Sequence, residues 1–151
     1  MRLDVQMARR AARLAAVQAL YQMEMSSATT EEVIAEFRAG KLPRETEASL
    51  TELKGDGELF KNLVENAVAR QATIDRAIAR RLKNWRLERI DAVARAILRA
   101  GAVELEQRQD IPTAVVLDEY VEIAHSFFYG PEPGFINATL EACAADLRPV
   151  A

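Results

Sequence analysis

Apolar side chains recur every three or four residues along most of the chain, which is the spacing of one face of an α-helix. No run shows the alternation of apolar and polar residues that is typical of a half-buried β-strand. The pattern therefore predicts an all-α protein. The helices that we expect cover residues 5–25, 30–40, 58–82, 87–108, 112–128 and 135–147.

Local signals mark several of these boundaries. Thr29 offers a side-chain cap, and Glu31 and Glu32 follow it as an acidic first turn. Pro112 suits the first position of a helix, where its missing N–H costs nothing. Between the helices, residues 41–57 predict a loop with room for a short helix, and residues 129–134 predict a turn.

Two of the expected helices have wide apolar faces that predict core packing. The stripe on the helix at 112–128 consists of Val116, Tyr120, Ile123 and Phe127. We interpret its aromatic side chains as packing groups rather than as a cofactor site. Gly101 lies on the apolar stripe of the helix at 87–108, where glycine costs up to about 1 kcal/mol relative to alanine. Its position predicts a close contact with another helix.

Size and composition narrow the class of protein. The chain has 151 residues, which suits one domain over residues 1–151. His125 and Cys143 are its only histidine and cysteine, so an intrachain disulfide and a thiolate zinc cluster are excluded. A nucleophilic enzyme site is poorly supported, because the chain has neither a Gly-rich phosphate loop nor a serine elbow. We therefore predict no catalytic residues, no metal and no cofactor.

The sequence also bears on location. No stretch approaches the roughly 18 apolar residues of a membrane span. Arginines near the N-terminus and the lack of an apolar h-region argue against a secretory signal. One unpaired cysteine fits a reducing compartment. We expect a cytoplasmic protein without a membrane partner.

The net charge of −3 hides a division along the chain. Residues 1–21 carry a net charge of +3 and residues 70–99 a net charge of +6. Residues 22–66 carry −5, and residues 101–151 carry −7. Local basic segments are what binding to a polyanion requires, so the two basic segments become candidates for that role. The acidic remainder is a candidate surface for a basic partner.

The first expected helix carries a ridge of arginines. At about 100° per residue, Arg2, Arg9 and Arg13 fall within about 40° of one another. Arg10 lies to one side, and no acidic residue follows Asp4 until the end of this helix. The arginines therefore lack partners one turn away in their own helix. Arginine suits bidentate phosphate contacts and stacking on bases. The residues alone leave two interpretations open, which are nucleic-acid binding and an ordinary solvated face.

The second basic segment could extend such a patch through Arg95 and Arg99. Asp91 lies four residues before Arg95, however, and is a candidate partner for it within one helix.

Four groups of motifs follow one another along the chain. They are ARRAAR at 8–13 with AVQALY at 16–21, AILR at 96–99 with EL at 104–105, DIP at 110–112 with LDEYVEIAHSF at 117–127, and FINATL at 135–140. Each motif alone is short, but together and in this order they are specific. In this respect the chain resembles the NusB family of bacterial transcription antitermination factors.

The resemblance implies a compact bundle of about seven helices in two packed helical subdomains. It implies a non-enzymatic, RNA-binding protein that pairs with NusE, a small-subunit ribosomal protein. The heterodimer would recognise single-stranded boxA RNA of ribosomal RNA leaders and join the RNA polymerase elongation complex with other Nus factors. Whether the protein forms a homodimer in the absence of NusE stays open. The positions that match RNA-associated positions of the family are Arg9, Arg10, Arg13, Tyr21, Arg99, Phe127, Phe135 and Asn137.

Several of these positions also admit a structural interpretation. Tyr21, Phe127 and Phe135 lie on or near apolar stripes and could pack in the core. Asn137 is a candidate cap of the last helix. The turn at 130–134 lacks the polar residues common in the family, so its contact with RNA stays open.

Two alternative functions stay open as well. One is a protein-binding regulatory adaptor without RNA contact. The other is a stand-alone relative of the NusB-like domain of ribosomal RNA methyltransferases.

Overall fold

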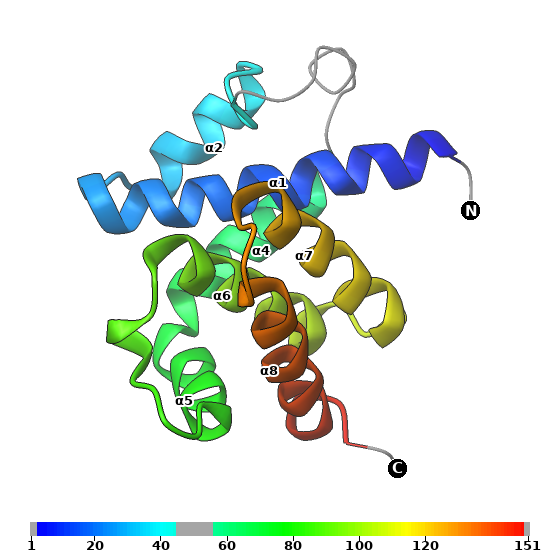
Figure 1. Ribbon diagram of the computed structural model, residues 1–151. Helices are drawn as coiled ribbons and strands as arrows, with labels where there is room; N and C mark the ends of the chain where they lie inside the picture. Colours follow the sequence, from blue (N-terminus) through cyan, green and yellow to red (C-terminus); the bar gives the residue numbers. More distant parts are fainter. Residues whose placement is uncertain (1–2, 45–55, 150–151) are drawn as a thin grey trace.

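The computed structural model describes residues 3–44 and 56–149 of the chain (Figure 1). Its elements are α1 (Leu3–Ser26), α2 (Thr30–Arg38), α4 (Gly57–Ala69), α5 (Gln71–Arg81), the 3-10 helix η1 (Leu87–Arg89), α6 (Ala92–Gln107), α7 (Thr113–Phe127) and α8 (Glu132–Leu147). The described residues contain no β-strand, which confirms the all-α prediction. Most of the loop expected at 41–57 lies outside the described residues, and so does Arg2.

The helices are arranged around α6, which is buried along most of its length. Five helices contact it, namely α1, α4, α5, α7 and α8. In Figure 1, α1 crosses the upper part of the molecule with α2 and α4 beside it, and α5 and α8 lie below. One hydrophobic core continues through the upper group, α1, α2 and α4, and the lower group, α5 and α8. This arrangement matches the expected bundle of two packed helical groups.

Alanines give α1 its close packing. Ala12, Ala15, Ala16 and Ala19 are all fully buried. Because a methyl group is the smallest side chain beyond hydrogen, the neighbouring helices α4 and α6 approach the α1 backbone closely on two sides. The helix is thereby held in place over its middle turns.

Gly101 marks a close approach of α6 to α8. A Cβ atom added at this glycine would lie 2.8 Å from Cδ1 of Leu140, which is itself fully buried in α8. The contact that the glycine predicted is therefore confirmed. Glycine is required here by packing, not by an unusual backbone angle.

The long helix expected at 58–82 is wrong, because the chain turns at Arg70 and forms two helices, α4 and α5. No glycine or proline marks this corner. The guanidinium of Arg70 donates to Glu106 of α6, from Nε at 2.6 Å and from Nη2 at 2.8 Å, and fixes the corner to the central helix. The bend lets α4 contact α1 and α2 while α5 contacts α8. Tertiary packing here overrides a continuous helical pattern.

Smaller differences occur at other helix ends. The helix expected from Leu87 begins instead at Ala92, because Asp91 accepts hydrogen bonds from the backbone N–H of Val93 at 2.8 Å and caps α6. Helix α8 begins at Glu132, three residues earlier than expected, since Pro133 is tolerated in a first turn.

The cap expected at Thr29 is confirmed. The hydroxyl of Thr29 accepts from the N–H of Glu32 at 3.1 Å, and the Glu32 carboxylate accepts from the Thr29 N–H at 2.8 Å. This reciprocal pair is a capping box, which satisfies two N–H groups at the start of α2.

Substitution of Gly101 tests the contact between α6 and α8. Overpacking by one methyl group costs about 1–3 kcal/mol, and better helix propensity offsets about 1 kcal/mol of it. We expect Gly101→Ala to lower the free energy of unfolding by about 1 kcal/mol in chemical denaturation. In a Leu140→Ala background the colliding atoms are absent, so the same substitution should stabilise. Equal effects in both backgrounds would contradict the contact.

Cys143 provides a second test of the core. Burial in α8 raises the pKa of its thiol to about 11, and its Sγ lies 3.7 Å from the carbonyl oxygen of Ala77. At pH 8 the folded protein should therefore react very slowly with a thiol reagent, and unfolding should expose the group. Since the thiol of an unfolded chain has a pKa of about 8.5, stability should decline as the pH rises from there toward 11. Rapid labelling of the folded protein would contradict this burial.

Candidate nucleic-acid interface

A buried ion pair joins the first helix to the centre of the molecule. Arg13 of α1 is 2% exposed, and Glu104 of α6 is fully buried. The guanidinium of Arg13 donates to both carboxylate oxygens of Glu104, from Nε at 2.9 Å and from Nη2 at 2.7 Å. The hydroxyl of Tyr120, on α7, donates to Oε1 of the same carboxylate at 2.8 Å. One carboxylate thus ties three helices together.

The protonation states of this cluster follow from burial and pairing. Desolvation lowers the pKa of Arg13, but its hydrogen bonds to Glu104 and the charge of that carboxylate outweigh it, so the net pKa is raised. Burial, together with the neighbouring Glu104 charge, raises the pKa of Tyr120 well above its ordinary value. Arg13 therefore stays charged and Tyr120 stays a hydrogen-bond donor.

The prediction that Arg13 lies on an exposed cationic ridge is wrong. The ridge was inferred from the lack of acidic partners within the same helix, yet the partners of Arg13 come from α6 and α7. Glu104 lies 91 positions away in sequence, and Glu119 of α7 lies 3.5 Å from Nη1 of Arg13. A guanidinium with two carboxylates supplied by other helices can be buried.

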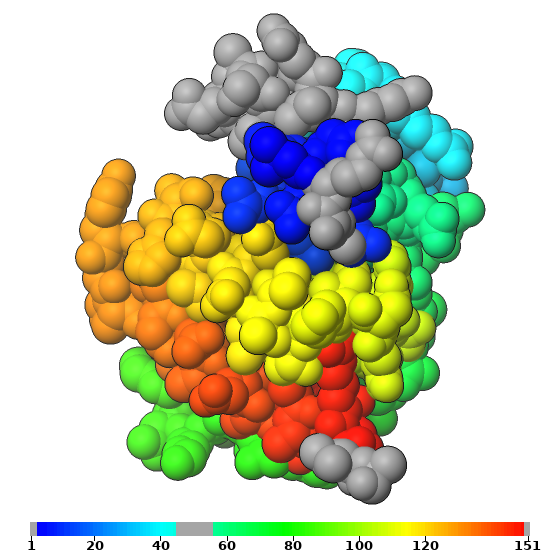
Figure 2. Space-filling view, turned by 90° about the vertical axis from the view of Figure 1, so that its right-hand side faces the viewer, coloured from blue at the N-terminus to red at the C-terminus, as the bar shows by residue number. Residues whose placement is uncertain are grey.

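Arg10 and Arg9 take different positions beside it. The Arg10 side chain is 57% exposed, and its Nε donates to the carboxylate of Glu119 at 3.1 Å. Arg9 points toward the start of α4, where its Nε lies 3.9 Å from a carboxylate oxygen of Asp56. The N-terminal half of α1 thus presents Arg10 on the α7 side and Arg9 on the α4 side. Figure 2 shows α7 directly below this end of α1.

The second basic segment does not continue this patch. Arg99 donates to both oxygens of Asp75 at 2.9 Å. Arg95 donates to Glu24, at the far end of α1, at 2.8 Å. Glu24 lies 14 residues beyond Arg10, or about 21 Å along the helix. The expected pairing of Asp91 with Arg95 is wrong, because Asp91 caps α6 instead. These two arginines are matched by carboxylates and hold α6 to α1 and α5.

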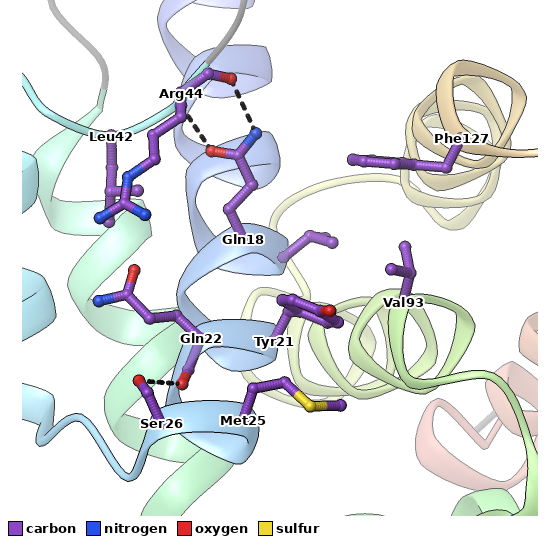
Figure 3. Close-up of a pocket in the computed structure, with 10 residues that line it drawn as sticks. Gln18, Tyr21, Gln22, Met25, Ser26, Leu42, Arg44, Val93 and Phe127 are labelled. Atoms are coloured by element: carbon purple, nitrogen blue, oxygen red, sulfur yellow. Dashed lines mark hydrogen bonds between the residues drawn. The ribbon is translucent and has the colours of Figure 1, made fainter.

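Two of the expected aromatic residues meet at a surface pocket. The side chains of Tyr21 and Phe127 are 39% and 40% exposed, and Figure 3 shows them on either side of the space between α1 and α7. The pocket has a volume of about 450 Å³, and its apolar lining includes Val17, Met25, Leu42 and Val93. On one wall, the Gln18 side chain and the Arg44 backbone exchange two hydrogen bonds, at 2.6 and 3.0 Å.

The structure separates the remaining aromatic and polar candidates. Phe127 was placed on a core stripe, but only Val116 and Tyr120 of that stripe are fully buried, because Phe127 ends α7 beyond the core. Phe135 is partly buried and packs against the core. Asn137 is the sixth residue of α8, so its expected role as a cap is wrong.

One exposed aromatic residue was missed. Tyr129 is 103% exposed and lies in the turn between α7 and α8. The orange segment that projects from the surface in Figure 2 is this turn. The signal that could have found Tyr129 is its position directly before Gly130-Pro131, where a large side chain has no helix to pack against.

Other kinds of site find no support in the residues described. Among residues 3–44 and 56–149, no helix is long and apolar enough to cross a membrane. In the same part of the chain, no three His, Cys, Asp or Glu residues come together in a group that could hold a metal ion.

Together these features define a class. The protein is all-helical, and its first helix carries an exposed arginine and an exposed tyrosine, residue types that nucleic-acid-binding proteins use. The comparison with known families then gives the particular one. The NusB family model matches residues 10–145, and the chain belongs to the NusB family.

Curated relatives and solved structures agree with this assignment. The chain is 55% identical to the transcription antitermination protein NusB of Caulobacter vibrioides over 93% of this chain and 94% of the relative. It is 49% identical to the NusB protein of Maricaulis maris, over 93% of this chain and 88% of the relative. A solved structure of T. maritima NusB is 29% identical with a TM-score of 0.75, over 93% of both chains. A chain from a crystal structure of a plectonemic RNA supercoil shares the fold, with a TM-score of 0.76 at 24% identity over 95% and 99%. Both relatives are named for transcription antitermination.

The buried pair and the exposed pair should respond differently to mutation. Glu104→Gln leaves the charge of Arg13 buried without its carboxylate, which should cost about 3–5 kcal/mol of the free energy of unfolding. Arg10→Ala breaks an exposed pair and should cost less than about 1 kcal/mol. Chemical denaturation of both variants measures the difference.

A combined replacement serves as the control for this prediction. Arg13→Met, Glu104→Leu and Tyr120→Phe together remove the buried polar groups while filling a similar volume. This variant should recover most of the stability lost in Glu104→Gln. If Glu104→Gln and Arg10→Ala were equally stable, the ion pair would not hold the helices together.

Proposed function

We propose that this protein is a transcription antitermination factor that acts in the cytoplasm. With NusE it would bind single-stranded boxA-type RNA of ribosomal RNA leader transcripts and join the RNA polymerase elongation complex with other Nus factors. The observation that carries the proposal is family membership, with relatives named transcription antitermination protein NusB at up to 55% identity among those compared. The exposed guanidinium of Arg10 on a rigidly held helix supports it.

The proposed phosphate contacts lie on the N-terminal half of α1. The pair between Arg10 and Glu119 is exposed on the arginine side, so exchanging Glu119 for a phosphate costs little. Arg9, which faces the start of α4 with its side chain 18% exposed, provides a second cation. Arg13 has a different role in this proposal: it fixes the position of α1 from within the core and does not contact RNA.

The proposed base contacts are the exposed aromatic rings. Single-stranded RNA offers unstacked bases, which stack on aromatic side chains. Tyr21, Phe127 and Tyr129 are exposed enough to provide such faces. Phe135 and Asn137, in the first turns of α8, would border this surface. Arg99 contributes less, because its guanidinium already donates to both carboxylate oxygens of Asp75.

Charge favours a basic protein partner on another part of the molecule. Residues 101–151 carry a net charge of −7, and Asp118, Glu122 and Glu141 are exposed on α7 and α8. Complementary charge speeds association and suppresses wrong partners. A ribosomal protein such as NusE is expected to supply the opposite charge.

An RNA titration tests the proposed function. Labelled boxA-type RNA is titrated with the protein, with and without NusE, at several salt concentrations. Wild type should bind weakly alone and more tightly with NusE. Each phosphate contact contributes about −0.7 to the slope of log K against log salt, so Arg9→Ala with Arg10→Ala should reduce the slope by about 1.4.

Arg38→Ala is the matched control, because Arg38 is an exposed arginine at the end of α2. It should leave both the affinity and the slope unchanged. Binding of NusE with no RNA binding under any condition would contradict the proposal and favour the adaptor without RNA contact.

A further inference from the structure

A second cationic surface lies between α5 and α6, and the proposed function does not use it. Five exposed cations occur within 14 residues, and none of them has an ion pair among the residues that the structure describes. The same stretch of chain contains Trp85, which is 62% exposed. We call this the Trp85 surface, and it consists of Arg76, Arg80, Lys83, Trp85, Arg86 and Arg89.

The nearby carboxylates do not neutralise the Trp85 surface. Asp75 accepts both its hydrogen bonds from Arg99. Asp146 accepts from Arg81 at 2.6 and 2.8 Å. Glu88 is the one acidic residue within 76–89. A local excess of positive charge therefore remains, although the whole chain is acidic.

The segment that carries Trp85 is anchored to the core on both sides. Leu82 and Leu87 are buried on either side of the exposed segment 83–86, at 6% and 7% exposure. The Arg95 guanidinium of α6 donates to the carbonyl oxygen of Leu87 at 3.1 Å. The segment that carries Trp85 is thus fixed to the core at both ends.

The cations are also ordered relative to one another. The N–H of Arg89 donates to the carbonyl oxygen of Arg86 at 2.9 Å in η1. This bond closes one turn of backbone and so fixes the spacing between the two arginines along the chain. Arg76 and Arg80 lie one turn apart on α5 and share a face of that helix.

We propose that the Trp85 surface is a second binding site for single-stranded RNA. A base stacks on the indole ring of Trp85, and the adjoining phosphates contact Arg86 and Arg89. A flat aromatic ring among cations is the combination that binds single strands without reading sequence. Four of the five cations are arginines, which also stack on bases and bind phosphate bidentately.

The position of this surface fixes which part of the strand it binds. In Figure 1 the segment between α5 and α6 lies at the opposite side of the molecule from the N-terminal end of α1. Helix α1 has 24 residues and is about 36 Å long. The Trp85 surface therefore binds RNA that extends beyond the segment held on α1. This role rests on the proposed function, since it extends the RNA path that begins there.

The single tryptophan of the chain makes the test direct, because all indole fluorescence comes from Trp85. Two RNAs are compared, a boxA-type oligonucleotide and the same oligonucleotide extended at either end by about ten adenylates. The extended RNA should bind more tightly and quench the emission, whereas the short RNA should leave it unchanged. Trp85→Ala should weaken binding of the extended RNA by about five- to tenfold, the lower part of the range for loss of one stacked base. Trp85→Phe should restore most of that loss.

Charge removal gives an independent readout. Arg86→Ala with Arg89→Ala should reduce the salt slope for the extended RNA by about 1.4 and leave the slope for the short RNA unchanged. Arg38→Ala and Val68→Ala are the matched controls, an exposed cation and an exposed apolar residue away from this surface. Neither should change binding of either RNA.

Failure of this proposal and failure of the proposed function give different results. If the short RNA does not bind at all, the proposed function fails, while quenching by the extended RNA still reports on Trp85. Unchanged emission at saturating extended RNA, or no gain in affinity from the extension, overturns the second site. A third outcome also overturns it: a polyglutamate peptide quenches the emission, and the extended RNA still binds more tightly than the short RNA in Trp85→Ala. That outcome assigns the surface to an acidic protein.

Discussion

The arrangement of the molecule depends on one buried interaction, the ion pair between Arg13 and Glu104 with Tyr120 as a second donor. It joins α1, α6 and α7 at a point where water is excluded, so neither charge can be left without the other. The alanine faces of α1 bring the helix close to its neighbours, and the ion pair adds directional hydrogen bonds to that packing. A bidentate ion pair fixes both its rotation and its register. The exposed position of Arg10 follows from that constraint.

Sequence reasoning succeeded where the determining interactions are local. The capping box at Thr29 needs only four consecutive residues, and the close approach at Gly101 follows from a glycine on an apolar stripe. It failed where the partner is distant in sequence. The corner at Arg70 depends on Glu106, and the burial of Arg13 depends on Glu104. The site was predicted in the same uneven way: Arg10, Tyr21 and Phe127 are exposed as RNA contacts require, Arg13 is not, and Tyr129 was missed.

The cations of the two basic segments therefore take three different kinds of position in the fold. Arg13 is buried and structural, and Arg95 and Arg99 bind carboxylates that hold helices together. Within these two segments, the exposed cations among the described residues lie at two separate places, the N-terminal half of α1 and the Trp85 surface. The net charge of a segment could not distinguish these outcomes, because each depends on which carboxylates the fold brings near. In a mildly acidic protein, binding to a polyanion is thereby confined to the places where no such carboxylate is available or where the pair is exposed and easily exchanged.

The central claim is that Arg13 positions the RNA-binding helix without contacting RNA. The most direct measurement is the salt dependence of boxA-type RNA binding by the variant that combines Arg13→Met, Glu104→Leu and Tyr120→Phe, which removes the buried charges and preserves the packing. The account predicts the wild-type slope of log K against log salt, because no phosphate contact is lost, with weaker binding because the constraint on α1 is lost. A slope reduced by about 0.7 in a fully folded variant, the value for one lost phosphate contact, would contradict it.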